Sequence, residues 1–310
     1  MIVTITLCTF IIWKGDWSRI WYTLQNSNIF LIIIVFFCMV FCVTISTFKW
    51  KVLLSIHKNH FSFLVLHKYY FTSVFFNNFL PTNIGGDAYR IYKTLQNSHF
   101  RAGALIAVFM ERITGIWALV ILGSIGYIVI CLQGITSNLL PWVVLAFLVI
   151  TMITSIACVI VLSRVMPRLL TNIRFLWKLK QCMEHLGDYC YEPAKTLQVV
   201  LISFFFHVFT LAWMIVLIRA LGADISIFKL VVAVMISNFV ALLPVSINGI
   251  GVMDGAFVYV IGKYGLEYEH ALMFMLFNRA LVVPISLIGG IFYLRDKHSL
   301  KIVKLKEDAL

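Results

Sequence analysis

The chain has 310 residues, of which 62% are hydrophobic and only 12% are charged, and its mean hydropathy is +0.97. A soluble domain is about one-quarter charged, so this composition predicts a polytopic membrane protein and excludes an ordinary soluble domain. The formal net charge of +12 does not indicate nucleic-acid binding. The basic residues lie mainly in short loops between apolar runs, as the positive-inside rule expects.

The predicted spans begin after an N-terminal segment, 1–13, that is apolar but short for a span and lacks the features of a signal peptide. Five later runs have the length of about 20 residues that a membrane helix needs. They are residues 29–48, 114–132, 142–163, 197–218 and 271–294.

Basic residues orient these spans. They gather in three segments, 49–58, 164–180 and 295–306, whereas the loop 133–141 carries no charge. By the positive-inside rule the basic segments and the C-terminus face the cytoplasm, and the uncharged loop is external. We therefore expect an integral protein of the cytoplasmic membrane.

This orientation implies that each of two further stretches enters and leaves the bilayer on the same face. Residues 61–101 must start and finish in the cytoplasm, and residues 228–270 must start and finish outside. Both are apolar and both are interrupted by proline and glycine, which predicts re-entrant hairpins that enter from opposite faces. The fold class expected is all-α, with about seven transmembrane helices and two opposed hairpins in an inverted-repeat-like arrangement.

The chain is expected to form one domain, 1–310, built from two halves. Half 1 covers about 29–132 and half 2 about 197–294. Between them, apolar residues at three- and four-residue steps predict a cytoplasmic amphipathic segment at 164–196.

The two breaks read PTNIGGD at 81–87 and PVSINGIGVMDG at 244–255. Proline ends the entering half-helix, and glycine permits close backbone approach and positive φ. The break residues are Pro81, Gly85, Gly86, Pro244, Gly249 and Gly251. An arginine follows each break inside an apolar run, at Arg112 and Arg279, roughly 12–15 Å along its helix.

Charged residues at this depth cost at least ~2.5–3.5 kcal/mol each, so they must be paired or line a cavity. One interpretation is an internal salt bridge that only holds helices together. The other is a lipid site. In it Arg112 and Arg279 bind phosphate and Arg90 guides anionic headgroups at the cytoplasmic mouth. The carboxylates Asp87, Glu111 and Asp254 would then hold a cationic headgroup.

A lone histidine, His207, lies inside a predicted span. It is a candidate proton relay, but a hydrogen-bonded packing role is the more common one for such a residue. The seven cysteines form no CxxC pair and the eight histidines show no zinc spacing, so we predict neither a metal nor a cofactor.

Four stretches carry a resemblance to a known family: NNFLPTNIGGDAYR, AGALIAVFMERITG, PVSINGIGVMDGAF and KYGLEYEHALMFMLFNRALVVPISLIGG. Over roughly residues 30–295 the chain resembles the lysylphosphatidylglycerol synthase transmembrane region, also called the flippase-like domain. The resemblance implies movement of aminoacylated or other phospholipids between leaflets. One departure is Asp254, where the family usually has glutamate.

In multiple peptide resistance factor proteins this domain precedes a soluble lysyltransferase domain, which we expect to be absent here. We therefore assign no catalytic residue and predict a flippase-like protein whose partners are membrane phospholipids, anionic or aminoacylated. Two alternatives stay open. One is a membrane-embedded transferase with Asp87 or Glu111 as general base, and the other is a non-transporting subunit of a lipid synthase. The sequence also leaves open whether the protein forms an oligomer.

Overall fold

The computed structural model describes residues 17–79, 85–98, 100–134, 185, 188–241 and 250–307. All the regular secondary structure in these ranges is helical, which confirms the predicted all-α class. Several predictions lie outside the described residues: the segment 1–13, the span 142–163, most of the amphipathic segment 164–196, and the break residues Pro81, Pro244 and Gly249.

Within the described ranges, four helices are long and apolar enough to cross a membrane. They match four of the predicted spans and establish an integral membrane protein. Their bounds are α3 (Ile29–Ile56), α6 (Arg101–Leu132), α11 (Pro193–Ala220) and α14 (Tyr268–Glu307). Two short helices lie outside this set, α2 (Trp17–Gln25) and α10 (Asp188–Tyr191).

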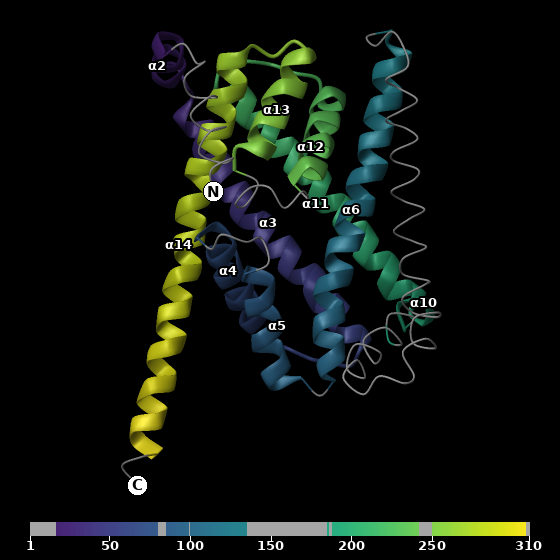
Figure 1. Ribbon diagram of the computed structural model, residues 1–310, viewed down its shortest axis with the longest axis vertical. Coiled ribbons are helices and arrows are strands. Elements are labelled where there is room, and N and C mark those ends of the chain that lie inside the picture. Colours follow the sequence, from purple (N-terminus) through teal and green to yellow (C-terminus); the bar gives the residue numbers. More distant parts are fainter. Residues whose placement is uncertain are drawn as a thin grey trace.

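The two predicted hairpins are both present as helix pairs. The first consists of α4 (Phe63–Phe79) and α5 (Gly85–Asn97), and the second of α12 (Ile227–Ala241) and α13 (Val252–Lys263). Figure 1 shows them at opposite ends of the bundle, with α4 and α5 in the lower half and α12 and α13 in the upper half. This is the opposed arrangement that the breaks predict.

Helix α3 continues beyond the predicted span, which corrects one expectation. The basic residues at 49–58 predict a loop that begins at Lys49, but the helix runs on to Ile56, and Lys49 is only 7% exposed. The reason is the apolar sequence after the lysines, in which Leu53 and Leu54 are fully buried and hold this last part of α3 in a core. Lys49 is therefore a buried helical residue.

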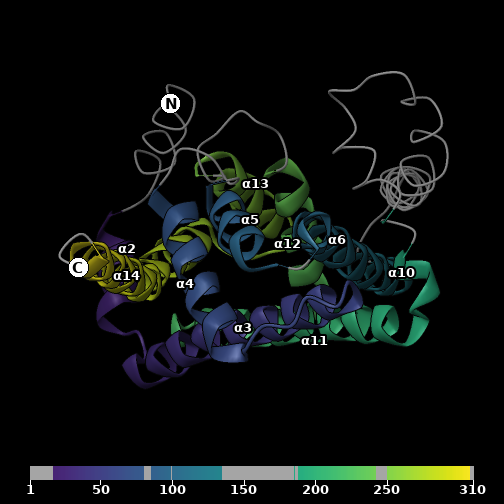
Figure 2. The same ribbon diagram turned by 90° about the horizontal axis from the view of Figure 1, so that it is seen from below.

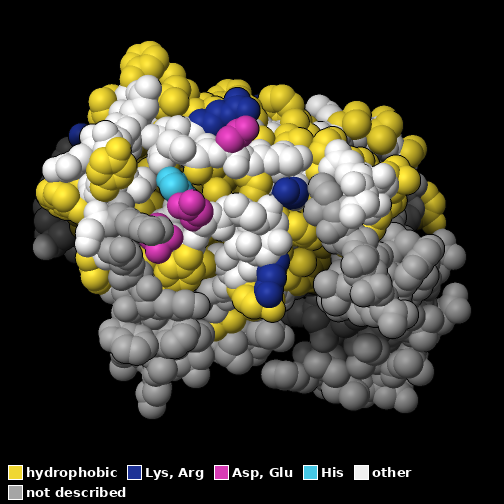
Figure 3. Space-filling view, turned by 90° about the horizontal axis from the view of Figure 1, so that it is seen from above, with side chains coloured by type: hydrophobic (Ala, Val, Ile, Leu, Met, Phe, Trp, Pro, Cys, Tyr) yellow, Lys and Arg dark blue, Asp and Glu magenta, His cyan; other side chains and the backbone are white. Residues whose placement is uncertain are grey.

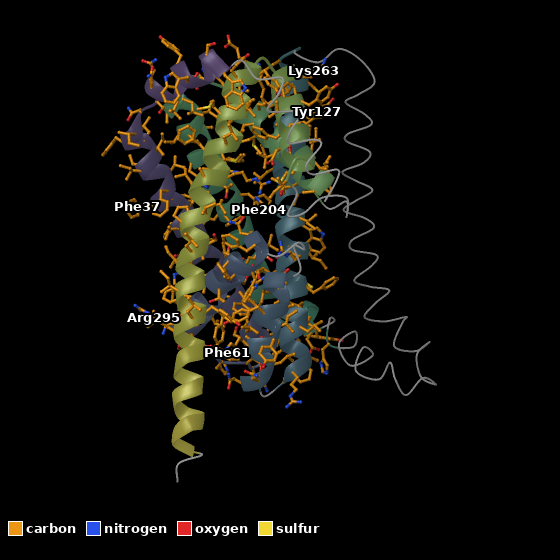
Figure 4. All side chains as sticks on the ribbon, turned by 60° about the vertical axis from the view of Figure 1, so that its left-hand side comes forward. Phe37, Phe61, Tyr127, Phe204, Lys263 and Arg295 are labelled. Carbon is orange, nitrogen blue, oxygen red and sulfur yellow. The ribbon has the colours of Figure 1, made fainter. Side chains whose placement is uncertain are left out.

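The outer faces of the long helices are apolar. On α3 the side chains of Ile33, Phe37 and Phe41 are exposed at steps of four residues, and Leu201 and Phe205 do the same on α11. Phe37 points away from the bundle in Figure 4. Helices α3 and α11 lie side by side (Figure 2). Large exposed apolar faces of this kind are suited to contact with lipid.

Charge is sparse at the upper end of the bundle. Figure 3 looks onto this end and shows a few charged side chains scattered among hydrophobic and neutral groups. Lys263 lies near this end and Arg295 lies far down α14 (Figure 4).

Helix α14 holds the first hairpin through a close backbone contact with α4. A Cβ atom built on Gly289 would lie 2.0 Å from the carbonyl oxygen of Phe71. The Thr72 hydroxyl donates to the Gly289 carbonyl at 3.3 Å. Small residues that let helix backbones approach in this way are typical of membrane proteins. The hairpin of half 1 is thus fixed against the last helix of half 2.

Candidate functional site

Four charged residues of half 1 form one connected network between α5 and α6, which we call the α5–α6 charge network: Asp87, Arg90, Glu111 and Arg112. Arg112 donates from Nε and Nη2 to Asp87 Oδ2, at 3.0 and 2.8 Å. Arg90 donates from Nη2 to Asp87 Oδ1 at 2.6 Å and from Nη1 to Glu111 Oε2 at 2.7 Å. Two carboxylates and two guanidiniums therefore alternate.

Arg90 lies at the buried centre of this network, so its predicted place at the mouth of the path is wrong. It is 2% exposed, and its guanidinium lies over the rings of Trp50 and Tyr70, 5.0 and 4.5 Å from their centroids. The Tyr70 hydroxyl donates to the free oxygen of Glu111, Oε1, at 2.8 Å. Both Glu111 oxygens are thus occupied by partners within the protein.

The carboxylates of half 1 are consequently not poised as general bases. Glu111 accepts from Arg90 and Tyr70, and Asp87 accepts from two arginines. A general base needs an oxygen within hydrogen-bond reach of the proton that it removes. These contacts do not favour the transferase alternative.

The second half contains a simpler pair. Arg279 Nη2 donates to both oxygens of Asp254, at 3.0 and 3.2 Å. Asp254 Oδ2 also accepts from the backbone N–H of Gly251 at 3.1 Å and so caps α13. The short side chain of this aspartate thus reaches both partners.

The two halves repeat the same unit of sequence and structure. In each half an aspartate in the first turn after the break pairs with an arginine 25 residues later. Both arginines, Arg112 and Arg279, lie about three turns into their long helices at 3.6 residues per turn. Internal ion pairs were one of the two interpretations of the sequence, and the geometry contains them in both halves.

Two glycines of the breaks have a definite structural role. A Cβ atom on Gly86 would lie 2.2 Å from the carbonyl oxygen of Ser73, and the Gly86 N–H donates to Asn77 Oδ1 at 2.8 Å. Gly251 has a φ of 83°, in the region that favours glycine. Gly85 is the first residue of α5. These residues let each hairpin close and place its aspartate.

A cavity of about 280 Å³ opens beside the α5–α6 charge network, between α3, α4, α6, α11 and α12. Of the predicted site residues, Glu111 and Arg112 line it, and the Arg112 side chain is 56% exposed. Asp254 and Arg279 are not among the residues that line it. The lining consists of Ser46, Lys49, Tyr70, Glu111, Arg112, Gly115, Ile116, Leu119, Phe206, His207, Asn238 and Phe239.

Two cavity residues, Lys49 and Asn238, were not predicted as site residues. Lys49 could have been found from the apolar residues that follow it, which continue the helix. Asn238 gave no such signal, since one amide in a helix is common. His207 was considered, and its Nε2 lies 3.0 Å from the Gly115 carbonyl oxygen. That bond fixes the ring against α6, as the packing interpretation expects, while the ring also lines the cavity.

Comparison with known proteins assigns the chain to a family. A family model described as Lysylphosphatidylglycerol synthase TM region matches residues 1–289. The chain belongs to this family. Searches of curated proteins and of solved structures find no significant match. The family, together with the four long apolar helices among the described residues, indicates a membrane protein of lipid metabolism or transport.

Proposed function

We propose that this chain is a flippase-like protein that translocates a phospholipid between the leaflets of the cytoplasmic membrane, with its C-terminus in the cytoplasm. A phospholipid crosses slowly by itself because its charged headgroup must enter hydrocarbon. A protein lowers that barrier by offering a polar cavity at membrane depth with groups that replace the headgroup's water.

The observation that carries this proposal is the charged cavity among membrane-spanning helices. Arg112 lines this cavity. It is held at Nε and Nη2 by Asp87, and its side chain is 56% exposed. A guanidinium held in this way is pre-oriented, and its remaining N–H groups match the geometry of a phosphate. Asp87 therefore positions Arg112 for the headgroup.

Half 2 would supply a second phosphate-binding site on the same path. Arg279 is 28% exposed and is held by Asp254, as Arg112 is held by Asp87, but through Nη2 alone. Because the two hairpins lie at opposite ends of the bundle (Figure 1), the two arginines provide a phosphate contact in each half. We propose that a headgroup passes from one half to the other.

The test is leaflet-resolved transport in reconstituted vesicles. Vesicles carry a headgroup-labelled fluorescent phosphatidylglycerol, and a membrane-impermeant quencher reports the fraction that reaches the outer leaflet. We expect the wild-type protein to accelerate exchange over protein-free vesicles, and Arg112→Gln to abolish most of that gain.

The matched control is Arg219→Gln. Arg219 pairs with Asp224 on the exposed surface, at 62% and 71% exposure, away from the cavity residues. This variant should transport at the wild-type rate. Exchange no faster than in protein-free vesicles, with folded wild-type protein, contradicts the proposed function.

A further inference from the structure

Lys49 carries a buried positive charge that lacks a carboxylate partner. Its Nζ donates to the Glu111 backbone carbonyl at 3.0 Å and to the Ser203 hydroxyl at 3.3 Å, and both acceptors are neutral. Among the residues that the structure describes, no carboxylate lies within ion-pair distance of it. An ammonium has three N–H donors, so one is left for another acceptor.

The neighbouring carboxylates are already paired with other groups. The backbone carbonyl of Glu111 accepts from Lys49, but the two carboxylate oxygens of Glu111 accept from Tyr70 and Arg90. In the α5–α6 charge network the charges of Asp87 and Glu111 are balanced by those of Arg90 and Arg112. Two further titratable groups line the cavity, His207 and Tyr70. His207 can only be neutral or cationic, and the Tyr70 hydroxyl is a neutral donor to Glu111. The described cavity therefore has a surplus of one positive charge, on Lys49.

The surroundings of the ammonium leave room for a ligand. Lys49 and Arg112 both line the cavity. Gly115 lies next to the ammonium, and a Cβ atom on it would be 3.7 Å from Lys49 Nζ. With hydrogen as its side chain, Gly115 leaves this space open. A buried charge without a counter-ion is costly, so an anion that enters the cavity gains from pairing with it.

We propose that Lys49 and Arg112 form a subsite for the phosphodiester of a singly anionic phospholipid, and that Lys49 makes the cavity select anionic over cationic lipids. This inference rests on the proposed function and narrows its substrate. The single negative charge of an anionic headgroup neutralises the surplus positive charge of Lys49. A singly cationic aminoacylated headgroup adds to it, because Asp87 and Glu111 are already engaged by arginines.

The test measures lipid affinity of the full chain in nanodiscs of phosphatidylcholine. Fluorescent phosphatidylglycerol is bound first and then displaced by phosphatidylglycerol, by lysylphosphatidylglycerol or by water-soluble glycerol phosphate. We expect phosphatidylglycerol to compete at least about tenfold better than the lysyl lipid, a factor that corresponds to about 1.4 kcal/mol. Equal or better competition by lysylphosphatidylglycerol overturns the selectivity, without the use of any variant.

Variants locate the effect. Lys49→Met should weaken phosphatidylglycerol binding by about tenfold or more, and Lys49→Arg should restore much of it. Lys51→Met is the matched control, since Lys51 lies on the same helix but does not line the cavity. Wild-type affinity in a folded Lys49→Met protein contradicts the proposal. Competition by glycerol phosphate as strong as by phosphatidylglycerol identifies a soluble phosphate ligand and refutes the lipid assignment.

The vesicle assay separates this inference from the proposed function. If the wild-type protein translocates phospholipid but Lys49→Met leaves lipid preference unchanged, only the role of Lys49 is wrong. If the wild-type protein translocates no phospholipid, the proposed function itself fails.

Discussion

The two halves of this protein use one structural unit in two ways. Each has a glycine-containing break, an aspartate in the first turn of the next helix, and an arginine 25 residues further on. In half 2 little is added to this unit. In half 1 the same unit carries additional charges and forms part of the cavity wall.

The difference is visible at equivalent positions counted from the aspartate. Three residues after Asp87 stands Arg90, whereas three residues after Asp254 stands Phe257. Phe257 is 2% exposed and stacks on Phe274, with ring centroids 5.0 Å apart. Before Arg112 stands Glu111, whereas Asn278 precedes Arg279. In half 2 the fold forms with Phe257 and Asn278 at these two positions. The additional charges of half 1, Arg90 and Glu111, therefore belong to the candidate site beside the cavity.

The largest expected effect comes from breaking the buried pair that only half 1 has. Glu111→Leu leaves Arg90 with Asp87 as its one remaining carboxylate partner, in a position that is 2% exposed. We expect a loss of about 3–5 kcal/mol in unfolding free energy. The equivalent change in half 2, Asn278→Leu, should cost less than about 1 kcal/mol. Denaturant unfolding in mixed micelles measures both, and equal losses would remove the distinction between the halves.

A smaller difference is expected between the two aspartates. Asp87 binds two arginines, and Asp254 binds one arginine and a backbone N–H. Asp87→Asn should therefore destabilise the protein more than Asp254→Asn, by about 1.5–3 kcal/mol, the contribution of one charged hydrogen-bonded partner. The same unfolding measurement checks this. A larger loss for Asp254→Asn would mean that the half 2 pair is the main structural element.

The smallest expected effects concern the glycines of the breaks. Gly86→Ala places a Cβ atom against the Ser73 carbonyl and should cost about 1–3 kcal/mol. Gly251→Ala must adopt positive φ, at about 1–2 kcal/mol. Gly262→Ala, a helical position with open space, is the control. It should leave the melting temperature unchanged or raise it. A fall for Gly262→Ala as large as for Gly86→Ala would show that the clash is not the cause.

Much of the fold was predictable because hydrocarbon imposes simple rules on a sequence. The apolar runs predicted the four long helices of the described residues. The two breaks predicted both hairpins and their placement at opposite ends of the bundle. The rule that failed was the assumption that a lysine ends a span. Lys49 continues in α3 because Leu53 and Leu54 bury the following turn. Its ammonium donates to two neutral acceptors, on α6 and α11, that are far away in sequence.

The site was predictable in its residues more than in its geometry. An internal salt bridge between the carboxylates and the arginines was one of two interpretations of the sequence. The equal spacing of 25 residues from Asp87 to Arg112 and from Asp254 to Arg279 was available in it. The position of Arg90 was not. Its depth depends on Glu111 and on the Trp50 and Tyr70 rings, and a one-dimensional pattern does not show which partners meet across helices.

The central claim is that an anionic lipid headgroup enters the cavity of half 1. Site-specific photocrosslinking in vesicles of mixed anionic and zwitterionic lipid tests it most directly, with a photoreactive residue at Ile116 or at Ile125. Both lie on α6, but Ile116 lines the cavity and Ile125 is 50% exposed on the outer surface. Mass spectrometry of the adducts should show anionic lipid enriched at Ile116 and bulk composition at Ile125. The same lipid composition at both positions would contradict the account.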